Sequence, residues 1–316
     1  MRAATLDDVT AEGAVVRLNG VDLFVRRLGD RDLPALVVIH GGPSWDHSYL
    51  LPALAELVDT AHVVLFDLRG CGRSHRTPPL GDLPESELRP HLLADDVAAL
   101  VDALGTGPVD VLGFSYGGRI AMRLVQRHPE VVDRLILAST TAYTDFDSEL
   151  AASADYQQRR RLCTEVGFDD PLLTGPAAPD GALSRAMADA EAPLQVWRLD
   201  RLDRWREVLD RVRFSSDYDR PYLSGSWPPG GPENAAEVLS DWGRPVLILH
   251  GQKEMSFPLE TARRLHAVLP ASTLAEIPDA AHMAHFDNPA EWLAAIRRFL
   301  RPRRSPLGPA AAPGAV

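Results

Sequence analysis

The chain has 316 residues, enough for one large α/β domain or for a core that carries an insertion. Its formal net charge of −11 makes nucleic acids and anionic membrane surfaces poor partners. No apolar run approaches the roughly 20 residues that a membrane helix needs, and the N-terminus has no apolar segment typical of a signal peptide. Cys71 and Cys163 lie far apart and form no metal-ligand spacing. These features predict a cytoplasmic protein with neither metal nor organic cofactor; they leave the oligomeric state open.

The first half of the chain alternates short strands with helices. Residues 14–17 and 21–26 are expected to form a hairpin, because Asn19-Gly20 suits a type I′ turn. Further strands are expected at 35–40, 63–67, 110–112 and 134–138, with helices near 47–58, 92–104 and 119–128. This alternation predicts an α/β fold with a mostly parallel, doubly wound sheet.

The alternation stops near Ala142 and resumes later. Strands are expected again at 245–249 and 273–277, with helices near 259–268 and 289–300. Two core segments, 1–142 and 241–301, are therefore expected to enclose a helical cap at 143–240. The proline- and alanine-rich residues 302–316 predict a disordered tail. The strongest helical pattern in the cap, Leu194–Phe214, has an apolar stripe that indicates core packing.

The pattern Gly-x-Ser-x-Gly at 113–117 follows a short apolar strand and precedes a helix. This context predicts that Ser115 is a nucleophile on a strained turn, with its hydroxyl clear of the sheet. Gly113 and Gly117 are expected there because side chains would collide with the neighbouring strand and helix. A serine hydroxyl is a weak nucleophile, so a base, an orienting acid and an oxyanion hole should accompany it.

The acid and the base are sought at the ends of later strands. Glu254 follows the strand at 245–249 and is the expected acid; Asp145 and Asp147, after the strand at 134–138, are the alternatives. His282, in the loop before the last helix, is the expected base, and His285 is its rival. Nucleophile, acid and base then follow one another along the chain in an order known among serine hydrolases.

Two backbone N–H groups, those of Gly42 and Tyr116, are expected to form the oxyanion hole. Gly42 belongs to the segment His40-Gly41-Gly42-Pro43, which follows a buried strand and lacks bulky side chains at the glycines. His40 itself is interpreted as a structural hydrogen-bonding residue. The segment Asp67–Ser74, after the next strand, is interpreted as a scaffold turn in which Cys71 packs and does not react.

With these motifs the chain resembles the α/β-hydrolase superfamily over about residues 21–142 and 245–300. His40–Pro43 and Phe66–Ser74 look like the proline iminopeptidase (prolyl aminopeptidase) branch. The resemblance implies an α/β-hydrolase fold with a cap, and cleavage of N-terminal residues, typically proline, by a serine triad. It also implies acidic cap residues that hold the free α-amine. Several residues differ from those usual in that branch: Ser44, Phe114, Glu254 and Ala281.

We therefore expect a serine hydrolase for a small-molecule or short-peptide substrate. It is an aminopeptidase or, alternatively, an esterase or lactonase; a lyase or isomerase and a non-catalytic binding protein are the remaining hypotheses. Residues 143–240 contain 18 acidic and 11 basic residues, a net charge of −7. Such a cap favours a substrate with a free amine, unless its charges only solvate the outer surface.

Overall fold

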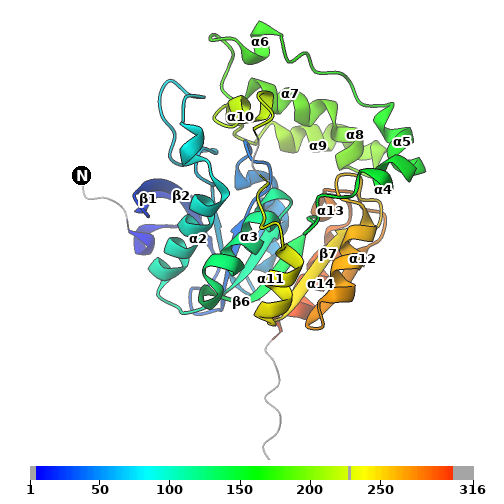
Figure 1. Ribbon diagram of the computed structural model, residues 1–316. Helices are drawn as coiled ribbons and strands as arrows, with labels where there is room; N and C mark the ends of the chain where they lie inside the picture. The colour runs from blue at the N-terminus through cyan, green and yellow to red at the C-terminus, as the bar shows by residue number, and fades with distance from the viewer. Residues whose placement is uncertain (1–4, 227–228, 302–316) are drawn as a thin grey trace, which may run out of the picture.

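Eight strands form one sheet through the middle of the molecule (Figure 1). The computed structural model describes residues 5–226 and 229–301; the predicted tail 302–316 lies outside them. The strand order is β1-β2-β4-β3-β5-β6-β7-β8, with β1 and β2 antiparallel to their neighbours and the remaining pairs parallel. The strands are β1 (Ala14–Leu18), β2 (Val21–Leu28), β3 (Ala35–Ile39), β4 (His62–Phe66), β5 (Val109–Phe114), β6 (Val132–Ala138), β7 (Val246–Gly251) and β8 (Ser272–Ile277). The predicted mostly parallel α/β sheet is confirmed.

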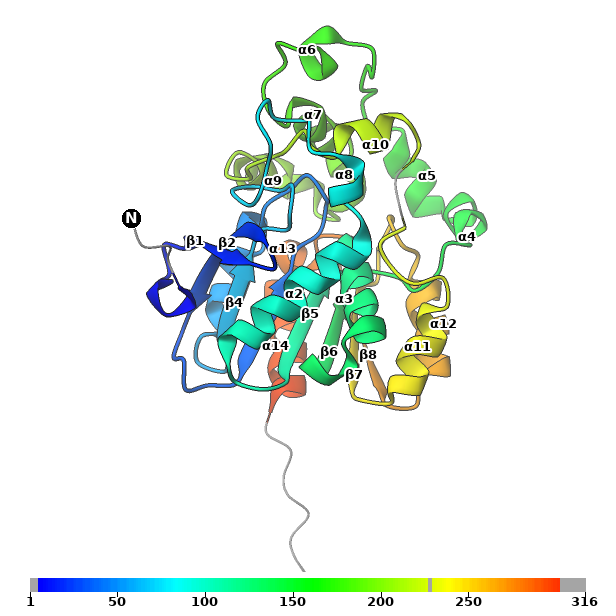
Figure 2. The same cartoon turned by 60° about the vertical axis from the view of Figure 1, so that its left-hand side comes forward.

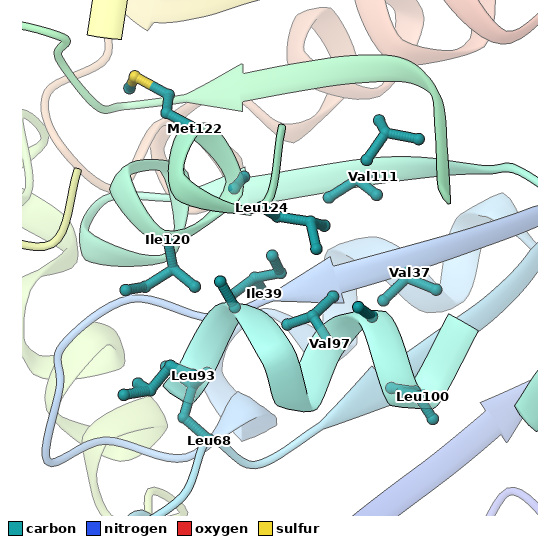
Figure 3. Packing of buried hydrophobic residues seen from close by; sticks show 14 of the residues in the cluster. Val37, Ile39, Leu68, Leu93, Val97, Leu100, Val111, Ile120, Met122 and Leu124 are labelled. Carbon is teal, nitrogen blue, oxygen red and sulfur yellow. The ribbon is translucent and has the colours of Figure 1, made fainter. Parts of the chain in front are cut away.

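Helices cover both faces of the sheet, because successive strand residues point to opposite sides and both sides are apolar. Val37 and Ile39 on β3 pack toward α2 and α3, as Figure 3 shows. Val38 belongs to the opposite core, which includes Trp292 of α14. The core helices are α1 (Leu51–Leu54), α2 (Pro90–Leu104), α3 (Tyr116–Arg127), α11 (Ala235–Trp242), α12 (Leu259–Val268), α13 (Ala284–Asp287) and α14 (Pro289–Leu300).

The turns of the N-terminal part follow from local residue types. Asn19 and Gly20 have φ angles of 46° and 75°, as a type I′ hairpin requires. One helix was expected near 47–58, but the chain there forms two 3₁₀ turns, His47–Tyr49 and Ala55–Leu57, around the short α1. Pro52, in the first turn of α1, explains the break before this helix, since proline inside a continuous helix lacks the N–H and clashes with the preceding turn.

Short helices of residues 143–234, the greater part of the segment expected as a cap, lie over the end of the sheet where its parallel strands finish (Figures 1 and 2). They are α4 (Asp147–Ala152), α5 (Ala154–Arg160), α6 (Pro171–Thr174), α7 (Ala182–Ala190), α8 (Ala192–Gln195), α9 (Leu202–Leu209) and α10 (Asp219–Leu223). No strand occurs among the described residues of this segment, which we call the cap. Throughout 5–226 and 229–301, no helix combines the length and apolar character needed to cross a membrane.

The long cap helix expected over Leu194–Phe214 is wrong. The chain there forms α8, an irregular stretch and then α9. The reason lies outside the segment: Asp287 of the core accepts hydrogen bonds from the backbone N–H groups of Trp197, at 2.8 Å, and Arg198, at 3.2 Å. These two hydrogen bonds take the place of hydrogen bonds within a helix, and they join the cap to the core. Trp205 of α9 is fully buried, in line with the core packing expected for the stripe.

Candidate active site

Ser115 stands on the sharp turn between β5 and α3. Its φ of 53° and ψ of −120° lie outside the regions that residues with a side chain usually adopt. Two hydrogen bonds hold this backbone: Ser115 N–H donates to the Ala138 carbonyl at 2.9 Å, and Thr140 Oγ1 donates to the Ser115 carbonyl at 2.7 Å. Both partners belong to β6 or to the residues just after it, so the neighbouring strand fixes the turn.

Glycines allow the strand and the helix to approach at this turn. A Cβ on Gly113 would lie 2.5 Å from Gly118 Cα, and one on Gly117 would lie 2.2 Å from the Ile39 carbonyl oxygen. These contacts agree with the collisions expected from the sequence. Gly118 has the same role and was not predicted, since its Cβ would lie 2.4 Å from Thr140 Cγ2. Its partner is 22 residues further along the chain, so no local pattern reveals it.

The structure brings Ser115, Glu254 and His282 into one hydrogen-bonded row. His282 Nε2 lies 3.1 Å from Ser115 Oγ, and His282 Nδ1 lies 2.9 Å and 3.0 Å from the two Glu254 carboxylate oxygens. A carboxylate only accepts, so Nδ1 carries the proton and Nε2 is left to accept from the serine hydroxyl. Each residue follows a different strand, respectively β5, β7 and β8, at the same end of the sheet.

Glu254 is held as a carboxylate. It accepts hydrogen bonds from the backbone N–H groups of Ser256, at 2.8 Å, and Phe257, at 3.4 Å, in addition to the one from His282. Burial raises the pKa of this carboxyl, but the imidazole of His282, its hydrogen bond, and His250 outweigh burial and hold the pKa below its ordinary value. The glutamate is therefore ionised where it faces the imidazole.

The alternative base, His285, does not approach the serine by any described hydrogen bond. Its ring packs among aromatic rings, 5.8 Å from that of Tyr49 and 5.2 Å from that of Phe114 between centres. Burial, and then the neighbouring His282, lower the pKa of His285 to about 3. His285 is a neutral packing residue beneath the row.

The alternative acids lie at the surface. Asp145 forms an ion pair with Arg264 at 2.7 Å, and 72% of its side chain is exposed. Asp147 is the first residue of α4 and is also exposed. Neither lines the cavity described below, whereas Glu254 makes contact with the imidazole. Of the three carboxylates considered, the structure therefore brings only Glu254 to His282 among the described contacts.

The two residues expected to supply the oxyanion donors, Gly42 and Tyr116, line the same cavity as Ser115. Tyr116 begins α3, whose N-terminal end directs N–H groups outward and favours negative charge. Gly42 has a φ of 108° and lines the same cavity as Ser115 and Tyr116. The preceding Gly41 N–H donates to Tyr49 Oη at 2.8 Å. The backbone of Gly42 is thus anchored on one side and faces the cavity on the other.

Histidine and aspartate side chains near the site support its loops. Leu68 N–H donates to His40 Nε2 at 2.9 Å, so His40 Nδ1 carries the proton and donates to the Gly41 carbonyl at 2.7 Å. Asp67 accepts from His47 Nδ1 at 2.6 Å and from Arg73 N–H at 2.9 Å. Both residues stabilise the loops beside the site, as their interpretation as scaffold predicts.

A cavity of about 510 Å³ lies between the strand ends and the cap. Ser115 and His282 line it from below, with aromatic side chains around them. Two cap carboxylates, of Glu191 and Asp219, line it from above. Burial, aided by Asp180 and Asp217, raises the pKa of Asp219 to about 7. Burial also raises the pKa of Glu191, against the opposing effects of Arg160 and His282.

Sequence reasoning missed one residue that positions the loop of His282, the expected base. Asp287 accepts from Ala281 N–H at 2.9 Å, directly before His282, and also from the two cap N–H groups already described. Burial raises the pKa of Asp287, while these three backbone donors oppose the rise. The buried carboxylate thus joins the His282 loop to the cap. In the sequence, Asp287 stands two positions before Pro289, where an acidic residue indicates only the start of a helix.

An eight-stranded, mostly parallel sheet with a strained serine after β5 and a histidine after β8 is the architecture of an α/β hydrolase. Sequence comparison agrees: the chain belongs to the alpha/beta hydrolase fold family, whose profile matches residues 34–289. The expected membership is therefore confirmed.

The relatives are named for different reactions. The RutD protein of Caulobacter sp. (strain K31), by name a carbamate hydrolase, is 28% identical over 284 residues, covering 83% of this chain and 94% of its own. The proline iminopeptidase of Lactobacillus helveticus is 24% identical over 292 residues, covering 89% and 95%. A thermophilic esterase from Thermogutta terrifontis has a similar structure, with a TM-score of 0.67, 25% identity and coverage of 92% and 98%.

Proposed function

We propose that the protein is a serine hydrolase that cleaves a small acyl substrate. The observation that carries the proposal is the continuous row from Glu254 through His282 to Ser115, which ends in the cavity. Within this geometry Ser115 Oγ attacks the carbonyl carbon while His282 Nε2 takes the hydroxyl proton. Glu254 holds the imidazole in the required tautomer and offsets the charge of the imidazolium.

The remaining steps use the same groups. The backbone N–H groups of Gly42 and Tyr116 stabilise the oxyanion of the tetrahedral intermediate. His282 then donates its proton to the leaving group, and an acyl ester on Ser115 remains. Water, deprotonated by His282, attacks this ester, releases the acid and regenerates the serine.

An active-site-directed fluorophosphonate probe tests the reaction class. We expect the protein to be labelled, and we expect labelling to vanish in Ser115→Ala, because the probe captures only an activated serine. Loss of labelling in His282→Ala as well would support activation by the imidazole. Absence of labelling in the folded wild-type protein would contradict the proposal and favour a binding protein on the same fold.

We infer that the protein is an aminopeptidase that removes N-terminal residues. The two cap carboxylates support this inference. Glu191 and Asp219 can receive an ammonium group above the nucleophile, and a resemblance to proline iminopeptidases agrees with such a substrate. An esterase or lactonase is the second candidate, since aromatic side chains such as Trp45 and Phe114 also line the cavity. A screen of aminoacyl arylamides, aryl esters and lactones, ranked by kcat/KM, distinguishes the two.

A further inference from the structure

One cationic side chain in the cavity has no part in the chemistry proposed above. Arg119 lies on α3 one helical turn after Ser115, so the two residues share a side of the helix. Among the described residues that line the cavity, Arg119 is the only arginine or lysine. It therefore places a positive charge on the core side, whereas Glu191 and Asp219 place carboxyl groups on the cap side.

An aromatic ring and a carbonyl fix the Arg119 guanidinium. Its Cζ lies 5.1 Å from the centre of the Phe257 ring, and that ring lies 5.7 Å from the ring of His282. Arg119 Nη2 also donates to the Tyr143 carbonyl at 3.3 Å. A guanidinium stacked in this way is held in one orientation, about one aromatic ring away from the imidazole.

Arg119 has no carboxylate partner in the part of the chain that the structure describes. Arg69 and Arg76, which protein also encloses, each bind two carboxylates. In contrast, the buried Nε of Arg119 makes no hydrogen bond to a described group. Burial lowers the pKa of Arg119, and only Tyr116 opposes this effect. Enclosing a cation without a counter-charge is unfavourable, so an anion that enters the cavity gains by binding there.

We propose that Arg119 binds a carboxylate carried by the substrate. A planar carboxylate matches the guanidinium fork, and the position beside Phe257 places it a short distance from the bond that Ser115 attacks. The proposal rests on the hydrolase function and names its substrate class: small acyl compounds that bear a carboxylate. A dipeptide belongs to this class, with its amine toward the cap carboxylates and its carboxylate toward α3.

The test compares mono-4-nitrophenyl glutarate with its methyl ester, two substrates that differ only in the charge of the remote group. In the wild type we expect a higher kcat/KM for the carboxylate. Arg119→Gln should lower the ratio of the two values roughly 10- to 100-fold, as for loss of a charge-assisted hydrogen bond. Arg119→Lys keeps the charge without the fork, so its ratio should fall between the two. An unchanged ratio in both variants would overturn the proposal.

The matched control is Arg123→Gln, on the same helix one turn further along. Arg123 donates to the Gly231 carbonyl and to Gln126 Oε1, and it does not line the cavity. We expect its ratio to equal that of the wild type. A loss as large as in Arg119→Gln would show that the effect comes from the overall charge of α3, and would overturn the assignment to Arg119.

Binding to the inactive protein separates this proposal from the hydrolase proposal. Mono-4-nitrophenyl glutarate is titrated calorimetrically into Ser115→Ala and into Ser115→Ala/Arg119→Gln. We expect the affinity to fall about tenfold or more in the double variant. If the fluorophosphonate probe does not label the wild type but binding depends on Arg119, the hydrolase proposal fails and the carboxylate site stands. If the esters are turned over but binding ignores Arg119, the carboxylate site alone fails.

Discussion

The backbone and the side chain of Ser115 have different tasks. Its φ of 53° lies in a region that costs a residue with a side chain about 1–3 kcal/mol. The same backbone lifts Oγ away from the sheet, to within 3.1 Å of His282 Nε2. The strain is maintained because Ala138 at the end of β6 and Thr140 just after it bind the turn on both sides. As a result, the Ser115 hydroxyl contacts His282 and is also accessible from the cavity.

Removing the proposed nucleophile or base should abolish turnover. We expect Ser115→Ala and His282→Ala each to lower kcat by roughly 10⁴- to 10⁶-fold on any substrate found, because the groups act as a unit. His285→Ala serves as the control and should retain most activity, although the lost packing lowers stability. Kinetics and thermal unfolding of the three variants check this. Retained activity in His282→Ala, together with loss of activity in His285→Ala, would contradict the assignment of His282 as the base.

A separate prediction concerns Glu254, the proposed acid. Glu254→Gln removes the charge but keeps the shape, so substrate binding should persist while kcat falls by about 10⁴-fold, as for the corresponding change in serine proteases. Asp145→Asn, which changes an exposed ion pair with Arg264, should leave kcat unchanged. Single-turnover kinetics on both variants distinguish them. The reverse pattern would place the acid after β6 instead of β7.

Some residues of the candidate site can be predicted from the sequence, and others cannot. Ser115 and His282 could be predicted because the fold ties each role to the end of a particular strand, and strands leave a clear apolar pattern. Glu191 and Asp219 could not be assigned, since cap packing and not local spacing brings them to the cavity. Arg119 follows Ser115 by one helical turn, but charged residues on helices are usually solvated, and the sequence does not distinguish any of the three from that majority.

At the scale of elements, a buried ion-pair network joins the cap to the loop after β4. Arg76 lies 2.6 Å from Asp217 and 2.5 Å from Asp180, and all but 5% of the Arg76 side chain is buried. Asp217 also accepts from the backbone N–H groups of Gly81 and Leu83. The cap is therefore fastened to the core at a point distant from its two chain connections.

Breaking this network should destabilise the protein. Arg76→Met leaves the fully buried Asp217 carboxylate, and the more exposed Asp180, without their cation, for which we expect a loss of about 3–5 kcal/mol in the free energy of unfolding, measured in urea. Arg76→Met/Asp217→Asn should recover part of the loss. Arg220→Met removes an exposed pair with Asp82 and should cost less than about 1 kcal/mol. Equal effects of the Arg76 and Arg220 variants would refute a structural role for the network.

Elements with a regular pattern were predicted well, and those shaped by distant contacts were not. The predicted range 259–268 coincides with α12, and 289–300 with α14, because each has an apolar face and a proline at or just before its start. The range Leu194–Phe214 has an equally regular stripe, yet Asp287 binds the backbone between α8 and α9. A carboxylate some 90 residues away decides the local structure there.

For the whole molecule, the distribution of charge bears on the choice of substrate. The segment 143–240 holds −7 of the net charge of −11. Most of its carboxylates are spread over the surface, where salt screens them, but Glu191 and Asp219 line the cavity, and Asp219 is half-buried there. Glu191 and Asp219, more than the net negative charge of the whole segment, should therefore determine whether the protein prefers a cationic substrate.

Acetylation of the substrate amine tests this preference. We expect kcat/KM for an aminoacyl arylamide to exceed that of its N-acetylated twin at least tenfold, with part of the difference remaining at high salt, because a half-buried carboxylate such as Asp219 is screened less than an exposed one. Asp219→Asn and Glu191→Gln should each reduce the difference. Equal turnover of the two compounds would exclude a role for the amine and favour the esterase or lactonase. Kinetics at about 0.05 M and 1 M salt provide the comparison.

The cap is inserted between strands that are neighbours in the sheet. The chain leaves β6 at Ala138 and returns in β7, where Leu135 pairs with Val246. Because the cost of closing a loop grows slowly, by about 0.6 kcal/mol for each doubling of length, the pairing of these strands tolerates large changes in what lies between them. Mutations in the cap can therefore change the residues that line the cavity from above, while the ends of β5, β7 and β8 stay in place. A protein of this architecture can thus acquire new substrates during evolution while it keeps the residues that follow these three strands.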